Sequence, residues 1–420
     1  MPSGTWWHLK TARSAKTRPS RRPRPSDRLR ARLAGRMDLL EYQGKQLFAT
    51  HGIPVPEGRP ASDVAGALAA AEEVGYPCVI KAQVGIGGRG KAGGIKIAES
   101  AEEAREHAEA ILGMQIRGPH GEGPFTVHEV WVERASDIDA EYYASIILDR
   151  SAKKLLTMLS AIGGMNVEEI AEKDPQALVR RYVEPSDGFD AARAGELASE
   201  AGLDEDVVED VGEVMAKLYE MFNATDATLV EVNPLIVTSE REVVALDSKV
   251  TIDNNALFRH EDIAELRNPA DEDPQEAMAK GRGLTYVKLD GSIGILGNGA
   301  GLCMATLDVV AQAGGRPANF LDAGGGSKAE AIVDALEVIT SDEKVTAILF
   351  NIFGGITRCD EIAKGIIDAY GRIEIDMPVV VRLDGTNSEE GLEMLADADL
   401  PNLHVEKTML GGAERVVELA

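Results

Sequence analysis

Residues 345–371 read VTAILFNIFGGITRCDEIAKGIIDAYG, and this stretch decides the fold class. The run 345–353 is almost wholly apolar, as in a strand that is buried on both faces. A glycine pair follows it, and residues 358–371 then place apolar side chains at helical spacing. A buried strand that passes through a glycine turn into an amphipathic helix is the repeating unit of a parallel α/β sheet.

The same unit recurs on both sides of this stretch. The predicted strands are 292–297, 318–324, 345–355, 377–385 and 403–407, and the predicted helices are 300–315, 328–342, 358–371, 389–399 and 412–420. Five apolar strands that alternate with helices predict a doubly wound parallel sheet. Ligands of such sheets bind at the carboxyl ends of the strands, where the glycines of this region gather.

Upstream, the acidic, proline-containing stretch RNPADEDPQE (267–276) has no period and is predicted to be a linker. Before it, helical and strand patterns mix. We expect helices at 37–52, 61–75 and 100–113, a helical stretch from 167 to about 223, and a hairpin made by 228–237 and 243–250.

A glycine-rich loop follows the short apolar strand that holds Lys81. Residues 85–94 read GIGGRGKAGG, with six glycines in ten positions. Glycines let backbone N–H groups approach phosphate oxygens, and Arg89 and Lys91 add positive charge. The pattern is not GxxxxGK[ST], so this is no Walker A loop. The alternative is an exposed hairpin loop whose basic residues are incidental.

The predicted hairpin offers a pair of metal ligands. If opposed residue numbers sum to 480, Asn233 faces Asp247 and Glu231 faces Lys249, and all four lie on one face because they alternate by two. Two opposed oxygen ligands suit one Mg²⁺ that also binds water and nucleotide phosphates. The alternative is the solvated face of an edge hairpin.

Two glycine turns lie in the parallel-sheet region. Gly297–Gly301 reads GNGAG and precedes Asp322 by about the spacing of a ribose-binding acid, so an NAD-binding Rossmann domain is one hypothesis. The second turn, 354–357, opens a helix whose N-terminus would favour an anion. The alternative for this second turn is a tight strand-to-helix turn that binds no ligand.

Charge is distributed unevenly. The chain of 420 residues has a formal net charge of −26; residues 1–36 hold 11 basic residues and one acid, so the remaining 384 carry −36. So acidic a body argues against nucleic acid or an anionic membrane as partner. The sequence contains no run of 18 apolar residues, so no membrane span is predicted. Its three cysteines lie far apart, which fits a reducing compartment rather than a disulfide framework.

Residues 1–36 are rich in Arg, Pro and Ser and are predicted to be a disordered basic extension. A transit peptide is one hypothesis, because the segment is basic and acid-poor. We favour a non-native start, with Met37 as the first natural residue, because a helical pattern begins there.

Six motifs carry a resemblance to a known family. They are LLEYQGKQLF (39–48), GGRGKAGG (87–94), LVEVNPL (229–235), NGAGL (298–302), ANFLDAGGG (318–326) and NIFGGITRCD (351–360). From 37 to 420 the chain resembles the β subunits of ADP-forming succinyl-CoA synthetases (succinate–CoA ligases). The resemblance implies an ATP-grasp nucleotide-binding region over 37–275 and a flavodoxin-like CoA-ligase domain over 285–420.

The resemblance also implies an activity and partners. Succinyl-CoA cleavage would be coupled to ATP or GTP synthesis in the citric acid cycle, with Mg²⁺, ATP or ADP as substrate, and a phosphohistidine on an α subunit in an αβ or α2β2 heteromer. Succinate, CoA and phosphate would be ligands of the complex, in the bacterial cytoplasm rather than the mitochondrial matrix. A malate–CoA ligase β subunit is the alternative, because one hydroxyl is a small pocket change.

Carried over position by position, the resemblance implies roles for individual residues. Glu231 would orient the partner's phosphohistidine and is the catalytic candidate, and Asn233 and Asp247 would bind Mg²⁺. The nucleotide-binding positions would be Lys81, Gly88, Arg89, Gly90, Glu133, Ser136 and Glu141, with the backbone of Glu133 and Ser136 meeting the adenine. The substrate-binding positions would be Asn298, Gly355, Ile356 and Thr357. None of this chain's own seven histidines is predicted to carry the phosphoryl group.

Overall fold

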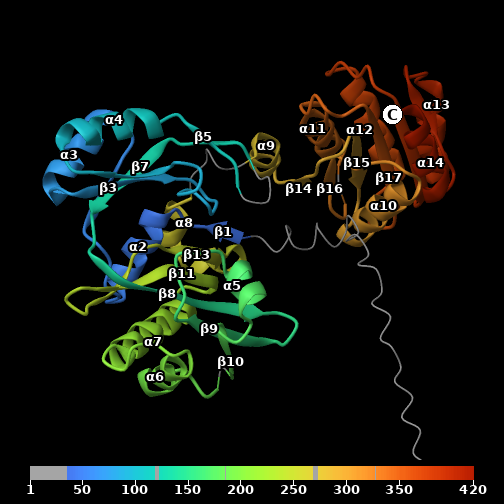
Figure 1. Cartoon of the computed structure of the whole chain (residues 1–420). Helices are drawn as coiled ribbons and strands as arrows, with labels where there is room; N and C mark the ends of the chain where they lie inside the picture. The colour runs from blue at the N-terminus through green and yellow to red at the C-terminus, as the bar shows by residue number, and fades with distance from the viewer. Residues whose placement is uncertain (1–35, 119–122, 185, 268–272, 327) are drawn as a thin grey trace, which may run out of the picture. The chain divides into compact units, whose positions relative to one another are not determined.

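The computed structural model describes residues 36–118, 123–184, 186–267, 273–326 and 328–420 (Figure 1). These residues form two compact units, an N-terminal unit up to residue 267 and a C-terminal unit from residue 273 onwards. The predicted disorder of 1–36 falls outside the described residues except at Arg36, which begins a strand.

The C-terminal unit is built on a six-stranded sheet with the order β14-β16-β15-β17-β18-β19. β15 to β19 are parallel, which confirms the predicted doubly wound sheet, and β14 pairs antiparallel with β16 at the edge. We did not predict β14, whose residues TYVK form no unbroken apolar run. The strands are β14 (Thr285–Lys288), β15 (Ile293–Gly297), β16 (Asn319–Asp322), β17 (Ala347–Gly354), β18 (Val379–Gly385) and β19 (Leu403–Val405).

Helices cover both faces of this sheet. One core contains residues of α10 and α14, and a second core contains residues of α11, α12 and α13. Because both faces are covered, every residue of β15 is buried, as its unbroken apolar run predicted. The helices are α9 (Pro274–Gly281), α10 (Ala300–Gln312), α11 (Ala329–Thr340), α12 (Cys359–Tyr370), α13 (Ser388–Asp397) and α14 (Met409–Leu419).

The N-terminal unit contains a seven-stranded antiparallel sheet, a four-stranded sheet of order β2-β7-β3-β4, and the pair β5–β6. The large sheet runs β1-β13-β11-β8-β9-β10, with β12 also paired to β11. Its strands are β1 (Arg36–Asp38), β8 (Ile138–Asp149), β9 (Lys154–Ser160), β10 (Val179–Val183), β11 (Ala227–Thr238), β12 (Val243–Ala245) and β13 (Lys249–Asp253). The other strands are β2 (Gly58–Ala61), β3 (Cys78–Gln83), β4 (Ile95–Ala98), β5 (Gln115–Ile116), β6 (Phe125–Thr126) and β7 (Glu129–Arg134).

The helices of this unit begin and end with recognisable signals. Asp63 caps α3 by accepting a hydrogen bond from the Gly66 N–H, and Gly75 ends it with a φ of 81°. Ser100 caps α4 in the same way. The helices are α2 (Glu41–Thr50), α3 (Val64–Val74), α4 (Ala101–Ile111), α5 (Val167–Lys173), α6 (Ala191–Glu200), α7 (Val208–Ala224), the 3₁₀ helix η1 (Asn254–Arg259) and α8 (Glu261–Glu265).

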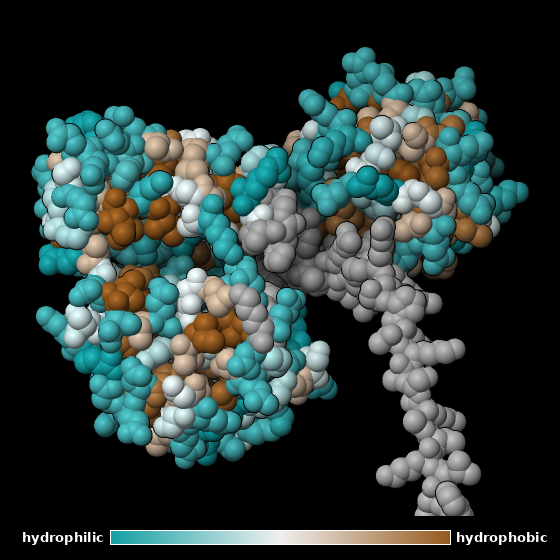
Figure 2. All heavy atoms as spheres, in the orientation of Figure 1, coloured by the Kyte–Doolittle hydropathy of each residue, from teal (hydrophilic) through white to brown (hydrophobic). Residues whose placement is uncertain are grey.

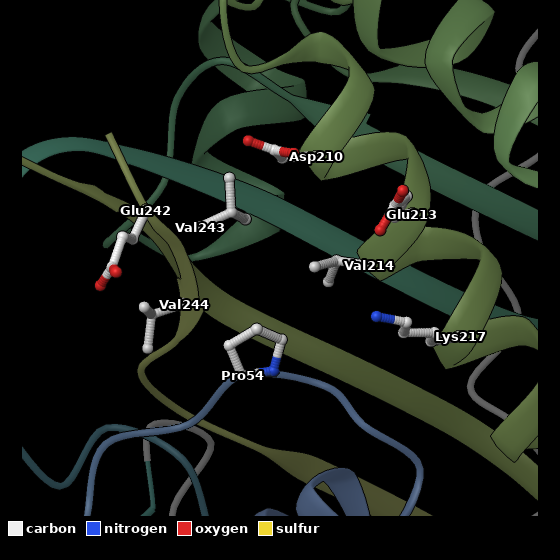
Figure 3. A pocket seen from close by; sticks show the side chains of 8 residues that line it. All are labelled: Pro54, Asp210, Glu213, Val214, Lys217, Glu242, Val243 and Val244. Atoms are coloured by element: carbon white, nitrogen blue, oxygen red, sulfur yellow. The ribbon is translucent and has the colours of Figure 1, made fainter. Parts of the chain in front are cut away.

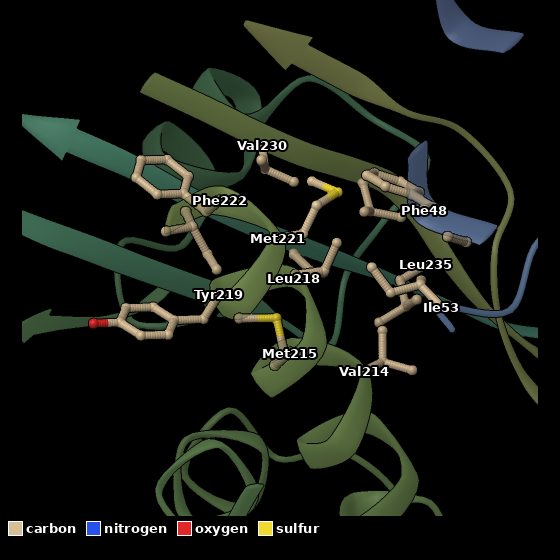
Figure 4. Packing of buried hydrophobic residues seen from close by; sticks show 14 of the residues in the cluster. Phe48, Ile53, Val214, Met215, Leu218, Tyr219, Met221, Phe222, Val230 and Leu235 are labelled. Atoms are coloured by element: carbon tan, nitrogen blue, oxygen red, sulfur yellow. The ribbon is translucent and has the colours of Figure 1, made fainter. Parts of the chain in front are cut away.

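Helix α7 anchors the main core of the N-terminal unit. Val214, Leu218, Met221 and Phe222 recur at helical spacing and pack with residues of α2, β8 and β11, among them Phe48 (Figure 4). α3 and α4 form a separate core with the four-stranded sheet. The large sheet and the small sheet are therefore each held by their own helices.

Three predicted elements of local structure are corrected. The helix expected from Met37 begins at Glu41, because Met37 pairs with Ile252 as part of β1. The helical stretch expected over 167–223 is interrupted by β10, which pairs with β9. The stretch expected to be a linker over 267–276 includes the start of α9, capped by Asp273, whereas 268–272 lie outside the described residues.

The surface seen in Figure 2 is mostly hydrophilic on both units, with separate apolar patches. Among the residues that the structure describes, every helix falls short of the length and apolar character that crossing a bilayer requires.

Candidate functional site

Six charged side chains meet in the N-terminal unit, from five separate parts of the chain. α2, β3, the glycine-rich loop, β7 and the segment between β12 and β13 each contribute. We call this group the ion cluster; it consists of Glu41, Lys45, Lys81, Arg89, Glu133 and Asp247. Three acids meet three bases, so its formal charge is zero.

Strand alternation explains how the small sheet contributes. Ile80 and Ala82 of β3 lie in the core under α3 and α4, as do Val130 and Val132 of β7. Because successive side chains of a strand point to opposite faces, Lys81 and Glu133 must emerge on the other face. The ion cluster therefore occupies the side of the small sheet that its helices leave uncovered.

Glu41 lies at the centre of the ion cluster. Its Oε1 accepts from the Lys81 Nζ at 3.0 Å and is 2.8 Å from the Lys45 Nζ, while its Oε2 accepts from Arg89 Nη1 at 2.5 Å. Arg89 Nη2 donates to Asp247 Oδ1 at 2.8 Å. The Glu41 side chain is 1% exposed and Arg89 is 8% exposed, whereas Asp247 is 34% exposed. The ion cluster thus meets solvent chiefly at Asp247.

Glu133 forms the inner end of the ion cluster. Its carboxylate accepts from Lys45 and from the Trp131 Nε1 at 2.6 Å, and Lys81 Nζ lies 2.5 Å from its Oε1. The carboxylate is fully buried. The side chain of Glu133 therefore holds two lysines, while the resemblance implied a role for its backbone.

The charges of the ion cluster stabilise one another. Burial by itself would raise the pKa of Glu41, but Arg89, Lys45 and Lys81 hold that pKa well below its ordinary value. Burial would lower the pKa of Lys81, but Glu133 and Glu41 raise it above its ordinary value. Glu41 and Lys81 are therefore both ionised at neutral pH.

The glycine-rich loop brings Arg89 into the ion cluster. Gly88 has a φ of 80°, and the N–H of Gly94 donates to the Arg89 carbonyl at 2.9 Å, which closes the loop. A Cβ on Gly94 would lie 2.9 Å from the Ile116 side chain and 3.0 Å from that of Ala82. Glycine is thus required at 94 by a close approach.

The hairpin register agrees with the prediction. Glu231 pairs with Lys249, and Leu235 pairs with Ala245, so opposed numbers sum to 480 on both sides of the expected ligands. The predicted second strand is split into β12 and β13. Asn233 and Asp247 therefore face the interruption of the ladder between 245 and 249, where side-chain oxygens are not confined by strand pairing.

Asn233 is oriented by a neighbouring loop. Its Oδ1 accepts from the Gly164 N–H and its Nδ2 donates to the Met165 carbonyl, both at 2.9 Å. A Cβ on Gly164 would lie 2.5 Å from a carboxylate oxygen of Glu141, so Glu141 lies over the same loop. Glu231 accepts from the Tyr143 hydroxyl at 3.1 Å.

Three further predicted nucleotide positions lie near these elements. Gly88 and Gly90 flank Arg89 in the exposed part of the loop, and Ser136 is half-buried between β7 and β8. The structure thus places Lys81 against Glu133 and Arg89 against Asp247, and Glu41 links the two pairs. The nucleotide-binding roles of Ser136 and Glu141 stay predictions.

The C-terminal unit gathers the other predicted positions at the carboxyl end of its sheet. Asn298 follows β15 and forms two hydrogen bonds of 2.9 Å with the N–H and carbonyl of Phe353 at the end of β17. Thr357 is buried and accepts from the Gly326 N–H at 2.9 Å. Ile356 is 88% exposed. Asn298 is therefore tied to the strand that leads into the 355–357 turn.

Asp322 has a structural role. Its Oδ1 accepts from the N–H groups of Gly299, at 2.6 Å, and Gly324, at 2.8 Å. The acid that a ribose would need in the NAD-binding hypothesis is thus engaged with the backbone of two turns.

Two family models match the chain, one for each unit. The ATP-grasp domain matches residues 38–237, and the CoA-ligase family matches residues 296–413. A succinate–CoA ligase [ADP-forming] subunit beta from Rubrobacter xylanophilus is 53% identical over 91% of this chain and 99% of its own length. The same-named subunit from Natronomonas pharaonis is 51% identical over the same shares.

This chain belongs to the family of succinate–CoA ligase β subunits.

Its fold is accordingly an ATP-grasp region followed by a CoA-ligase domain, as the motifs predicted. The structure of ATP citrate lyase from Methanothrix soehngenii, solved with citrate and coenzyme A, has the same fold, with a TM-score of 0.70 at 20% identity over 91% of this chain and all of that one. Because the relatives are named succinate–CoA ligases, the comparisons do not favour the NAD-binding or malate alternatives.

A shallow hollow of about 280 Å³ lies elsewhere on the N-terminal unit of this β subunit (Figure 3). Pro54 and Val244 line one part of it, and Asp210, Glu213 and Lys217 line it from α7. It shares no lining residue with the predicted nucleotide site. It is therefore separate from the residues that the family motifs identify.

Two members of the ion cluster, Glu41 and Lys45, were not predicted as site residues in this β subunit. Both belong to the motif LLEYQGKQLF and stand four residues apart, one helical turn. An acid in the first turn of a helix with a lysine at i+4 is usually a solvated pair that supports the helix. The burial of both was the missing information.

Proposed function

We propose that this chain is the nucleotide-binding β subunit of an enzyme that interconverts succinyl-CoA, ADP and phosphate with succinate, CoA and ATP. Phosphate displaces CoA to give succinyl phosphate, a histidine takes the phosphoryl group and releases succinate, and ADP receives that group. The observation that carries the proposal is the convergence of Lys81, Arg89 and Asp247 in one ion cluster.

The cations of the ion cluster suit a nucleotide phosphate tail. Phosphoryl transfer depends mostly on positioning and charge neutralisation, which a lysine and a bidentate guanidinium provide. Arg89 joins one buried carboxylate, Glu41, to one partly exposed carboxylate, Asp247. We expect the exposed contact to be exchanged for a phosphate oxygen, while the buried contact stays.

The residues present fit a magnesium ion. Mg²⁺ is usually held by one or two carboxylates together with waters and phosphates. Asn233 presents an oriented amide oxygen, and Asp247 presents a carboxylate that is a third exposed. No group of three or more His, Cys, Asp or Glu side chains suited to a metal occurs among the described residues. When bound, the metal neutralises phosphate charge.

The histidine of the reaction is proposed to come from an α subunit, in an αβ or α2β2 complex. His51 bonds the Leu47 carbonyl, His107 bonds the Ile97 carbonyl, and His260 bonds Asp226. These contacts give the three histidines ordinary structural roles. A cytoplasmic location remains a prediction.

The proposal is tested by reconstitution. We expect the chain with its cognate α subunit to form ATP from succinyl-CoA, ADP, phosphate and Mg²⁺, with succinate and not malate accepted in reverse. We expect the chain alone to bind Mg-ADP without turnover. Turnover by the isolated chain, or binding of NAD in place of Mg-ADP, would contradict the proposal.

A further inference from the structure

The buried carboxylate of Glu41 contacts all three cations of the ion cluster. Its Oε1 contacts the ammonium groups of Lys81 and Lys45, and its Oε2 accepts a hydrogen bond from Arg89. The three cations come from α2, β3 and the glycine-rich loop, so one side chain fixes the relative positions of three elements. Of the three cations, Glu133 contacts the two lysines but not Arg89, and Asp247 accepts a hydrogen bond from Arg89.

The two cations predicted to meet phosphate, Lys81 and Arg89, are both held from the interior. Lys81 lies between Glu41 and Glu133, and also donates to the Leu246 carbonyl at 2.9 Å. Arg89 lies between Glu41 and Asp247. Because Glu41 is 1% exposed and Asp247 is 34% exposed, an incoming phosphate can replace Asp247 at the guanidinium but cannot take the place of Glu41.

We infer that Glu41 is a positioning residue for nucleotide binding, which fixes Lys81 and Arg89 relative to each other for contact with the phosphate tail. The inference rests on the proposed function, since it assigns these two cations to the phosphate tail. Glu41 touches neither substrate nor metal in this role. It acts through the two cations and keeps them from moving apart.

A purely structural role is the rival explanation. It predicts that loss of Glu41 lowers stability and weakens every ligand to the same degree. A positioning role predicts instead a loss confined to ligands that carry phosphates. The two explanations therefore differ in the ratio of affinities for Mg-ADP and for adenosine, which lacks the phosphate tail.

The test compares Glu41→Gln with Glu73→Gln in the full-length chain, by titration calorimetry with Mg-ADP and by displacement with adenosine. Glu41→Gln keeps the side-chain volume and removes the charge, and we expect Mg-ADP to bind about 10- to 100-fold more weakly, because a charged hydrogen bond is lost behind each cation. Adenosine affinity should stay unchanged. Glu73 pairs with Arg59 at 2.6 Å at a half-exposed position, so Glu73→Gln should change neither affinity.

Two further variants keep the inference testable if Glu41→Gln does not fold. Glu41→Asp keeps the charge but retracts it by one methylene, and should show a smaller loss for Mg-ADP alone. In the Arg89→Gln background, Glu41→Asp should cost less Mg-ADP affinity than in the natural chain, because its effect passes partly through Arg89. Equal losses for Mg-ADP and adenosine, or strict additivity with Arg89→Gln, would overturn the inference. Absence of Mg-ADP binding in the natural chain would instead reject the proposed function.

Discussion

Replacing Lys45 with methionine tests whether the ion cluster stabilises the N-terminal unit as a balanced set. Lys45 is 1% exposed and lies against Glu41 at 2.8 Å and against Glu133. Methionine keeps most of the side-chain volume, so the main effect is electrostatic. The formal charge of the buried ion cluster would change from zero to −1. Glu133 would keep only Lys81 and Trp131 as partners.

The expected cost is large because one partner of a buried pair is removed. Breaking such a pair costs about 3–5 kcal/mol, since an uncompensated charge remains in the interior. We therefore expect Lys45→Met to lower the free energy of unfolding of the N-terminal unit by about that amount. Adding Glu133→Gln restores neutrality, so the double variant should lose less than the sum of the single losses, by about 0.5–3 kcal/mol.

Urea unfolding followed by tryptophan fluorescence measures this loss in the right unit. The chain has three tryptophans, at 6, 7 and 131, so replacing Trp6 and Trp7 with phenylalanine leaves Trp131 as the only indole. Its Nε1 lies 2.6 Å from Glu133, inside the ion cluster. Lys91→Met is the matched control, since Lys91 is 72% exposed and its pair with Glu169 should be worth at most about 1 kcal/mol. A loss below about 1 kcal/mol for Lys45→Met, or strict additivity with Glu133→Gln, would refute the reasoning.

Three other predictions concern separate sites. Asp247→Asn should remove the Mg²⁺-dependent part of ADP binding while the fold persists, as measured by calorimetry with and without metal; an unchanged Mg²⁺ dependence would contradict the hairpin site. Asp226→Asn should lower the free energy of unfolding by about 1–2 kcal/mol at pH 7, because hydrogen bonds, chiefly from Arg259, hold the pKa of Asp226 at about 2. In urea titrations, the difference in stability between the variant and the natural chain should shrink as pH falls from 3.8 toward 2, and a pH-independent difference would count against this prediction. Asn298→Ala frees the backbone of Phe353 and should raise the KM for succinate more than that for ADP in the reconstituted enzyme, whereas equal changes would argue for a general loss of structure.

The C-terminal sheet was predictable because its signals are local. β15 and β17 are apolar runs buried on both faces, and each is followed by a glycine turn and an amphipathic helix. The hairpin register at Glu231 was equally readable, since polar and apolar residues alternate along both strands. In each case, residues near in sequence carry the whole pattern.

The errors arose where distant pairing overrides local pattern. Met37 belongs to a strand because it pairs with Ile252, more than 200 residues away. β10 contains two arginines and lies at a sheet edge beside β9, so its sequence shows no core-facing run. Neither partner can be found from the periodicity of the segment itself, since periodicity reports only which faces are apolar.

The same limit explains why the site was only partly predicted. Arg89 stands in a glycine-rich loop, Lys81 in the strand before that loop and Asp247 in the predicted hairpin, and these local patterns suggest phosphate and metal binding. Glu41 stands in a helical motif where an acid is unremarkable, and its role depends on the burial that three elements create around it. Sequence patterns identify groups that face a ligand more readily than groups that act through other side chains.

The ion cluster also resolves how so acidic a chain can hold an anion. Residues 37–420 carry a formal charge of −36, and the cations of the ion cluster are already matched by three carboxylates. Attraction by net positive charge therefore cannot account for phosphate binding. We expect affinity to come from an exchange at Asp247: its carboxylate would leave Arg89 and bind the metal, and the guanidinium, still held by Glu41, would donate to a phosphate oxygen instead. Nucleotide and metal would then favour each other's binding, because a metal that binds Asp247 frees Arg89 for phosphate, and a phosphate that binds Arg89 frees Asp247 for the metal.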